Sequence, residues 1–293
     1  MEKVSVIIPV YNGEKYISQS INSVINQTYN KIEIIIINDG STDKTEEIIF
    51  ENFYELIKNG RIIYKKQQNC GRNIAGNEGA KLANGKYIFF LDADDLWKKN
   101  HIEEMLKIFN KTEADAIYTK PRIFIDENNN IKRISNSKIE KDIDKLIFSS
   151  RIGFPSATGF RKKSFIGYNP DFHFREDIEL FIRLRLENKN IVIADTNSVM
   201  IREHNSPNRM SKDSKFYKYT LKLYETYKNK IPYGYRANFY LHIAEIALKF
   251  GDFYTGNKIL LQAIKDKPSI LFDARNMLNI IKRLARLDKF LKS

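Results

Sequence analysis

The sequence predicts an α/β protein with a doubly wound, mostly parallel β-sheet, followed by a C-terminal extension made only of helices. Two observations predict this fold class. Over the first 120 residues, short apolar runs alternate with segments whose apolar residues recur at helical spacing. Such alternation with short connections is typical of a parallel sheet covered by helices. From residue 212 onward, only helical spacing remains.

The strands expected in the first part of the chain are apolar runs rich in β-branched residues. They are VSVIIPV at 4–10, IEIIIIN at 32–38, RIIYK at 61–65, KYIFFLD at 86–92 and DAIYT at 115–119. Between them, apolar periodicity predicts helices at about 14–26, 43–58, 73–84 and 101–111. Thr42 or Asp43 is expected to cap the second helix and Asn100 the fourth, because short polar side chains accept from unpaired helix amides.

The pattern becomes mixed after residue 120. RIFIDENNNIKRI predicts a β-hairpin with ENNN at its turn, and further patterns predict a helix at 176–187 and a strand near 191–195. We interpret 1–210 as one domain with two halves, 1–120 and 121–210. Residues 211–293 then form the helical extension.

The helical extension carries most of the positive charge. The net charge of the chain is +13, and residues 200–293 contain 19 Lys/Arg and 8 Asp/Glu, a net of +11. Small residues within 237–270 match the spacing of a tetratricopeptide repeat, namely Ala244, Ala247, Gly256 and Ala263. One repeat cannot form a solenoid, because about three are needed to bury a core. The segment is therefore expected to form a single TPR-like hairpin.

Several protein classes are disfavoured by composition. The longest apolar runs are far shorter than the ~20 residues of a membrane span. Cys70 is the only cysteine, which excludes an intrachain disulfide and a cysteine zinc site. The chain begins without the long apolar region of a signal peptide. We therefore expect a cytoplasmic protein.

Three polar clusters follow successive strands, at Tyr11-Asn12, at NDGSTD (38–43) and at DADD (92–95). Ligands of such sheets bind at the carboxyl ends of the strands. A helix cap explains one aspartate of DADD but not three, whose mutual repulsion a divalent cation would offset. The second cluster alone is also consistent with a simple turn and cap, and Tyr11 with packing at a strand end.

The chain resembles the family 2 glycosyltransferases with the nucleotide-diphospho-sugar transferase (GT-A, Rossmann-like) fold. The resemblance covers about residues 3–205 and rests on VSVIIPVYN (4–12), INDGSTD (37–43), GKYIFFLDADD (85–95) and REDIELFIRL (175–184). One departure stands out. The family often has Ala-Arg-Asn before the glycine of the third helix, whereas this chain has Ala75-Gly76-Asn77. Arg72 is the candidate replacement for the missing arginine.

The resemblance implies an inverting, metal-dependent transfer of a sugar from a nucleotide-diphosphate donor, with a UDP-sugar expected. Mg²⁺ or Mn²⁺ would neutralise the diphosphate leaving group. Asp94 is the expected main metal ligand, with Asp92 binding metal or ribose, and Asp95 orienting the loop or sharing the metal. The donor-binding residues implied by the resemblance are Pro9, Tyr11, Asn12, Glu14, Asp39, Gly40, Ser41, Arg72, Asn77, Asp92 and Ala93.

A second acidic pair, Glu176-Asp177, opens the predicted helix at 176–187. The resemblance places the general base here, and we choose Asp177, with Glu176 as the alternative. Acidic residues in the first turn of a helix also stabilise its dipole, which would need no catalytic role. His204 is a candidate metal ligand, since related enzymes often have Arg-x-His at this place. A histidine on a surface loop would be equally consistent.

Two other functions are weighed. A sugar-1-phosphate nucleotidyltransferase would share the fold, but such enzymes usually have a Gly-rich loop after the first strand, where this chain has PVYNG. A non-catalytic binding protein built on helical repeats would leave the acidic clusters unexplained. Nucleic acid is not expected as a partner, because no recognition motif accompanies the basic region.

The last segment, residues 275–293, is expected to form an amphipathic helix. It holds six Lys/Arg and one Asp beside a stripe of Ile and Leu. Such a helix can lie on an anionic membrane surface or pack on a protein core with its basic side in solvent. Many relatives build surface polysaccharides on lipid carriers, so a glycan or lipid-linked acceptor at the inner face of the cell membrane is implied by the resemblance.

Overall fold

The computed structural model describes residues 2–137, 139–204 and 213–273 and four later positions, Met277, Leu278, Ile280 and Lys282. The chain divides into two compact units, each described below by itself. The larger comprises Met1–Lys141 and Ile152–Asn205, and the smaller comprises Asp142–Arg151 and Ser206–Ser293. The division expected from sequence differs here, because it placed 142–151 in the first domain.

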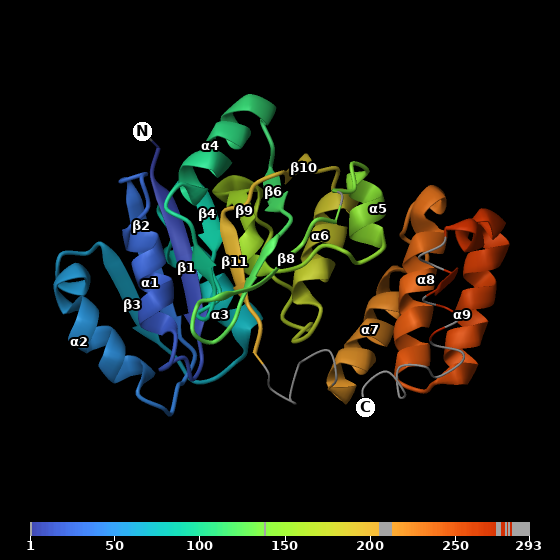
Figure 1. The fold of residues 1–293 in the computed structure, drawn as a ribbon, viewed down its shortest axis with the longest axis horizontal. Coiled ribbons are helices and arrows are strands. Elements are labelled where there is room, and N and C mark those ends of the chain that lie inside the picture. Colours follow the sequence, from blue (N-terminus) through green and yellow to red (C-terminus); the bar gives the residue numbers. More distant parts are fainter. Residues whose placement is uncertain are drawn as a thin grey trace. The chain divides into compact units, whose positions relative to one another are not determined.

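The larger unit contains a seven-stranded sheet with the order β10-β6-β9-β4-β1-β2-β3 (Figure 1). Its strands are β1 Val4–Val10, β2 Ile32–Asn38, β3 Ile62–Lys66, β4 Tyr87–Phe90, β6 Ala116–Thr119, β9 Thr158–Arg161 and β10 Ile191–Ala194. The pairs β1–β2, β1–β4, β2–β3 and β6–β10 are parallel, and β9 runs antiparallel to both β4 and β6. The mostly parallel sheet is confirmed, whereas β9 was not predicted.

The continuous apolar runs form strands that are buried on both faces. Every residue of β2 is buried, including Asn38 at its end. The helices of this unit are α1 Ile17–Ile25, α2 Thr45–Lys58, α3 Arg72–Leu82, α4 His101–Thr112 and α6 Glu176–Leu186. Helix α3 approaches the sheet closely, since a Cβ at Gly79 would lie 2.4 Å from Ile7 Cγ2. The five helices expected here therefore form, and helices cover the sheet as the apolar runs require.

The expected side-chain caps differ in detail. Lys44 occupies the N-cap position of α2, so neither Thr42 nor Asp43 is the cap. Asp43 still accepts from the Thr45 amide at 3.0 Å. Asn100 lies at the N-cap of α4 but makes no capping bond, because its amide donates to Glu104 Oε1 at 2.6 Å.

A second, four-stranded sheet lies in the same unit, with the order β5-β11-β7-β8. Its strands are β5 Leu96–Trp97, β7 Ile123–Ile125, β8 Ile131–Ile134 and β11 Val199–Arg202. The antiparallel pair β7–β8 confirms the predicted hairpin. β11 pairs with β5, which directly follows the DADD cluster. This pairing brings the end of β11 to the acidic loop, although neither strand was predicted.

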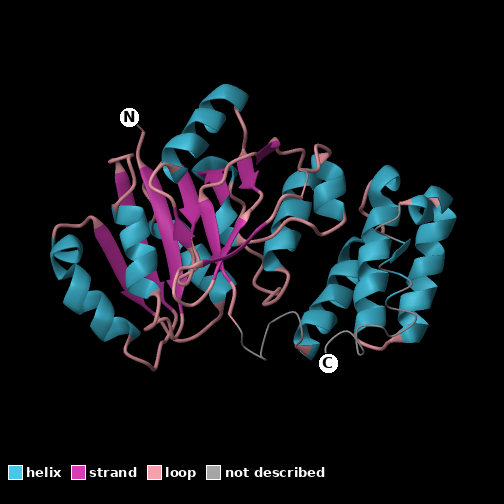
Figure 2. Cartoon of the chain, viewed as in Figure 1, coloured by secondary structure: helices cyan, strands magenta, loops and turns pink. Residues whose placement is uncertain are grey.

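In the described part of the smaller unit, every regular element is a helix (Figure 2). The elements are α5 Ile143–Phe148, α7 Ser214–Tyr227, α8 Tyr233–Lys249, α9 Phe253–Asp266 and the 3-10 helix η4 Pro268–Phe272. Helices α8 and α9 form a hairpin in which Ala244, Ala247 and Ala263 are buried. Gly256 is needed for their close approach, because a Cβ there would lie 2.7 Å from two side-chain atoms of Leu248.

Among the residues that the structure describes, we find no helix long and apolar enough to cross a bilayer. The amphipathic helix expected at 275–293 falls almost wholly outside those residues, so it stays a prediction.

Candidate active site

Two loops that follow neighbouring strands, 11–14 after β1 and 38–45 after β2, are joined by reciprocal hydrogen bonds. The Asn12 amide donates to Ser41 Oγ at 3.0 Å, and the Asn12 side chain accepts from the Thr42 amide at 2.8 Å. The Glu14 carboxylate accepts from the Lys44 amide at 3.0 Å. Of the residues expected to bind the donor, Asn12, Glu14 and Ser41 therefore hold the two loops together.

Tyr11 lies at the exposed end of the first loop. Its side chain is 52% exposed, so its ring is available to stack on a base. Pro9, two residues earlier, lines a small pocket beside the acidic residues. Gly40 has φ +75°, and a Cβ there would lie 2.8 Å from the Asn69 amide nitrogen. Only glycine fits both the conformation and the close backbone approach at this position.

Asp39 is buried and organises the loop that precedes α3. One oxygen accepts from Gln67 Nε2 at 2.7 Å and from the Cys70 amide at 3.0 Å. The other accepts from the Gly71 amide at 2.8 Å. A carboxylate has about four acceptor sites, so roughly one stays available for a ligand. Asp39 can thus contact a nucleoside only while also holding this loop.

The three carboxylates of the DADD cluster lie in different surroundings. Asp95 is buried and accepts from Ser156 Oγ at 2.6 Å and from the Arg202 amide at 2.9 Å. Burial, together with the charges of Asp94 and Asp92, raises the pKa of Asp95 well above its usual value. Of its two expected roles, orienting the loop is the one that these contacts support.

Asp94 faces outward from the same loop, with its side chain 38% exposed. Its Oδ2 lies 2.7 Å from His204 Nε2. His204 follows β11, whose last residue, Arg202, donates from Nε to the Asp94 carbonyl at 2.8 Å. Ser20 Oγ donates to the Ala93 carbonyl at 2.8 Å, which fixes the loop from the side of α1. The structure therefore brings His204 to Asp94, although 110 positions separate them.

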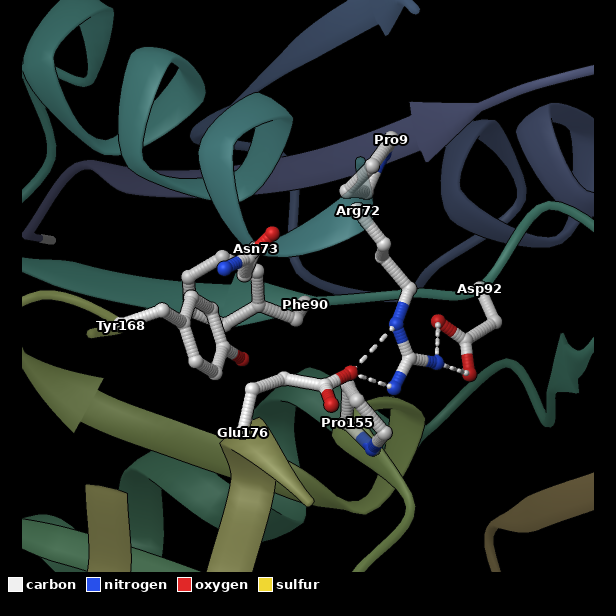
Figure 3. A pocket seen from close by; sticks show the side chains of 8 residues that line it. All are labelled: Pro9, Arg72, Asn73, Phe90, Asp92, Pro155, Tyr168 and Glu176. Carbon is white, nitrogen blue, oxygen red and sulfur yellow. Dashed lines mark hydrogen bonds and ion pairs between the residues drawn. The ribbon is translucent and has the colours of Figure 1, made fainter. Parts of the chain in front are cut away.

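Arg72 joins the third carboxylate, Asp92, to the second acidic pair. Its Nη1 lies 3.2 Å from both oxygens of Asp92, and its Nη2 lies 2.5 Å from Glu176 Oε1. Figure 3 shows the guanidinium between the two carboxylates, with Pro155 beside them. Arg72 thereby connects the end of β4 to the start of α6.

Asp177 lies next to this ion-pair network, at the N-terminus of α6. Burial and the neighbouring Glu176 charge raise the pKa of the Asp177 carboxyl, while Arg72 and Arg175 oppose the rise. A raised pKa makes a carboxylate a better proton acceptor. Glu176 is already bound by Arg72, and Asp177 stays the predicted general base, with Glu176 as the alternative.

The predicted site residue Asn77 has other partners in this structure. Its side chain donates to the Tyr168 carbonyl at 2.8 Å and accepts from the Tyr168 amide at 2.7 Å. A Cβ at Gly76 would lie 3.1 Å from the ring of Tyr168, which occupies the space beside this helix position. Asn77 therefore holds the segment that carries Tyr168, and its expected contact with the donor stays a prediction.

The residues around Asp94 fit a divalent cation that is shared with a diphosphate. Within the described part of the chain, no three His, Cys or carboxylate side chains converge as a complete protein site. Mg²⁺ and Mn²⁺ do not need one, because they are often held by one or two protein groups plus substrate phosphates. The exposed Asp94 carboxylate beside an imidazole is such a partial ligand set.

Sequence reasoning missed two residues that build the site. Ser156 donates to Asp95 and accepts from the Asp92 amide at 2.9 Å, and the Arg202 side chain braces the Asp94 backbone. Both come from elements that were not predicted, next to β9 and in β11. The only signal for Arg202 was its place two residues before His204.

Comparison with known proteins agrees with this geometry. The family described as "Glycosyl transferase family 2" matches residues 5–168. The minor teichoic acid biosynthesis protein GgaB of Bacillus subtilis is 44% identical over 117 residues, which are 39% of this chain. That region is only 13% of GgaB. The chain therefore spans a small part of this curated relative.

Two solved structures share the fold. S. aureus TarS 1-349 in complex with UDP-GlcNAc superposes with a TM-score of 0.62 at 18% identity, over 90% of this chain and 80% of that one. The mannosyltransferase PcManGT of Pyrobaculum calidifontis, in complex with GDP-Man and Mn²⁺, gives 0.60 at 15% identity over 97% and 87%. At these identities the likeness concerns the GT-A fold.

The family match covers more than half of the chain and includes the three polar clusters described above. The match is to a glycosyltransferase family, which favours that function over the nucleotidyltransferase and the non-catalytic repeat protein that were also weighed. The chain belongs to glycosyltransferase family 2.

Proposed function

We propose that this enzyme is an inverting, divalent-cation-dependent glycosyltransferase that moves a sugar from a nucleoside-diphosphate donor to a glycan or lipid-linked acceptor. The observation that carries the proposal is the placement of two acidic groups around Arg72. On one side lies the exposed Asp94 with His204 and Asp92, and on the other lies Asp177 with its raised pKa.

The loops after β1 and β2 support the part of the proposal that concerns donor binding. The exposed ring of Tyr11 would stack on the base, and the remaining acceptor capacity of Asp39 would meet the base or ribose. Gly40 lets the backbone of this loop approach closely. TarS and PcManGT were solved with UDP-GlcNAc and GDP-Man, which supports a nucleotide sugar as donor class, and we favour a UDP-sugar.

A bound Mg²⁺ or Mn²⁺ would supply charge neutralisation for the departing diphosphate. Asp94 and His204 would hold it, with Asp92 on the ion or the ribose. Arg72 lies where its positive charge can also face a diphosphate. The Mn²⁺ in the PcManGT complex supports this cofactor class.

The transfer step follows from the position of Asp177. The acceptor hydroxyl oxygen forms a bond to the anomeric carbon while the bond from that carbon to the diphosphate oxygen breaks. The hydroxyl proton passes to Asp177, and the nucleoside diphosphate leaves with the electron pair. Attack from the side opposite to the leaving group inverts the anomeric configuration.

The acceptor and the place of action are inferred more broadly. GgaB acts in teichoic acid biosynthesis by its name, which supports a surface polysaccharide or glycoconjugate as product. We place the enzyme in the cytoplasm, at the inner face of the membrane, where lipid-linked acceptors would be met.

The proposal is tested by the base variant. Asp177→Asn should still bind donor in calorimetry with Mn²⁺, because the proposed base would act on the acceptor hydroxyl, while turnover falls by roughly 10²–10⁴. The donors to screen are UDP-glucose, UDP-galactose, UDP-N-acetylglucosamine and GDP-mannose. A fully active Asp177→Asn beside an inactive Glu176→Gln would move the base by one residue. Binding of none of these donors would reject the function.

A further inference from the structure

Phe154 has a backbone conformation that neither its size nor its sequence neighbour favours. Its φ is +64° and its ψ is +90°. Bulky side chains rarely adopt positive φ, and a residue before proline is normally extended with negative φ. The next residue is Pro155. Strain of this kind persists only where the surroundings enforce it, and it gathers at functional sites.

The surroundings of Phe154 are fixed by hydrogen bonds to the acidic loop. The Ala157 amide donates to the Phe154 carbonyl at 2.9 Å. Trp97 Nε1 donates to the Ser156 carbonyl at 2.7 Å, and Ser156 Oγ donates to Asp95 at 2.6 Å. The segment 153–157 is therefore fastened to the loop that carries the proposed cation ligands.

Both neighbours of Phe154 face the catalytic residues. A Cβ at Gly153 would lie 3.0 Å from Asp177 Oδ2, so the backbone of Gly153 lies against the proposed base. Pro155 lines the pocket of Arg72 and Glu176, as Figure 3 shows. The backbone of Phe154 thus connects a residue that lies against the proposed base to one that lines this pocket.

Phe154 is nevertheless 43% exposed as a residue. Its ring meets Phe124 edge to face, at 6.5 Å between centroids and 70° between planes. Phe124 is in turn covered by the Arg133 guanidinium, 3.5 Å from its centroid. These contacts orient the Phe154 ring without burying it. A residue whose role was only to pack the core would be expected to be buried.

We propose that Phe154 binds the acceptor by stacking its ring on the apolar face of a pyranose, so that the acceptor presents a ring sugar rather than an open-chain polyol. This inference rests on the proposed function. One face of a pyranose carries several C–H groups, and these suit the negative face of an aromatic ring. Gly153, the residue before Phe154, lies against Asp177, so a sugar held by Phe154 would be near the group proposed to accept the proton of its hydroxyl.

The test separates the contribution of the aromatic ring from that of apolar bulk at position 154. Phe154→Leu keeps an apolar group, Phe154→Trp keeps an aromatic one, and Phe154→Gly removes both while accepting positive φ without strain. Tyr54→Leu is the control, because Tyr54 is a 55% exposed aromatic on α2. The acceptor probes are methyl β-glucoside, methyl β-galactoside and methyl β-N-acetylglucosaminide, with ribitol 5-phosphate as the open-chain probe.

Acceptor binding is measured by saturation-transfer NMR with UDP and Mn²⁺, and transfer is measured with the donor that the wild type hydrolyses. We expect Phe154→Leu and Phe154→Gly to raise the KM for a methyl pyranoside by about tenfold. Phe154→Trp and the control should stay near the wild-type value, as should donor hydrolysis without acceptor in every variant. The unfolding midpoint of Phe154→Gly should not fall, which separates binding from a structural role.

Three outcomes would overturn the inference. The first is that Phe154→Leu keeps full affinity for the methyl pyranosides. The second is that this variant loses as much affinity for ribitol 5-phosphate as for a pyranoside. The third is that the wild type hydrolyses a donor but binds no pyranoside. Failure to bind any nucleotide sugar would instead count against the proposed function. The NMR comparison needs no turnover, so it tests Phe154 in that case as well.

Discussion

Asp92, Asp94 and Asp95 lie within four positions of the chain, yet each carboxylate has a different partner. Asp95 is held inside by Ser156, Asp92 is paired with Arg72, and Asp94 faces outward beside His204. The strand end supplies all three, and the contacts from other elements separate their roles. Asp94 is the one best suited to a metal ion, because it is the most exposed and, in the described part of the chain, lies beside an imidazole and not beside an Arg or Lys.

Asp94→Ala should reduce turnover to background and leave the fold intact. Asp94 is partly exposed and its side chain contacts the partly exposed His204, so the change should remove a cation ligand with little effect on the core. Calorimetry with Mn²⁺ and a nucleotide sugar should show that donor binding is lost, while the circular dichroism spectrum stays unchanged. Full wild-type activity in excess chelator would reject the metal role of this residue.

The acid side of the pH profile should report Asp177. Only the deprotonated base is active, so kcat/KM falls as the pH drops through its pKa, which burial and Glu176 place above the ordinary 3.8. Arg72→Ala removes a positive charge that lowers this pKa and also leaves Glu176 unpaired. The acid limb should then move to higher pH, as measured by kcat/KM between pH 5 and 9.

Arg72→Lys is the matched control, because it keeps the charge and loses the planar fork. Its acid limb should stay nearer to that of the wild type. If the acid limb of kcat/KM had the same apparent pKa in the alanine and lysine variants, the charge of Arg72 would not be what sets the pKa of Asp177.

At the scale of elements, the regular parts of the fold were predictable and the irregular ones were not. β1 and β2 read as continuous apolar runs because both of their faces are covered, and α4 has a strongly amphipathic pattern. β5 has two residues and β9 has four, including Gly159. Strands of two to four residues are too short to show an alternation of apolar and polar side chains. Their formation depends on pairing with strands that are distant in the sequence.

The site residues at the ends of the long strands were predictable from the sequence, whereas the contacts made by the short strands were not. Tyr11, Asp39 and the DADD aspartates sit at ends of strands that the sequence marks clearly. The contact between Asp94 and His204 depends on β11 pairing with β5, and the one between Ser156 and Asp95 depends on the entry to β9. No local pattern in the sequence specifies either pairing.

The hairpin of α8 and α9 offers a test of close packing. Gly256→Ala places a Cβ 2.7 Å from Leu248, and overpacking of this kind costs about 1–3 kcal/mol. Gly234→Ala, in the first turn of α8, meets no atom within 4 Å and should be neutral or stabilising. Denaturant unfolding of both variants measures the difference. Equal free energies of unfolding for the two variants would mean that α8 and α9 can move apart enough to accept the added Cβ without loss of stability.

At the scale of the whole molecule, charge separates the two ends of the chain. Residues 1–199 carry a net charge of only +2, because +11 of the total +13 belongs to residues 200–293. Such a distribution would favour contact between the C-terminal part and anionic surfaces. The membrane association that we infer for this enzyme would depend on that part.

Residues 275–293, with a net charge of +5, should bind vesicles that contain anionic lipid. Each basic group near such a surface contributes about 1 kcal/mol, and added salt should weaken binding because charge is screened over ~8–10 Å. Co-sedimentation compares the full chain with one that ends at Lys267. Equal sedimentation of both chains, or equal binding to neutral vesicles, would contradict membrane attachment.

The position of β9 between β4 and β6 has a consequence for biosynthesis. β9 pairs with Tyr87–Phe89 on one side and with Ala116–Tyr118 on the other, so the two parts of the sheet join only through it. Residue 161 must therefore leave the ribosome before the sheet can close. Until then the nascent chain exposes the apolar edge of β4, a surface on which chaperones act and unfolded chains aggregate. The seven-stranded sheet can therefore be complete only after β9, and then β10 at its edge, have been synthesised.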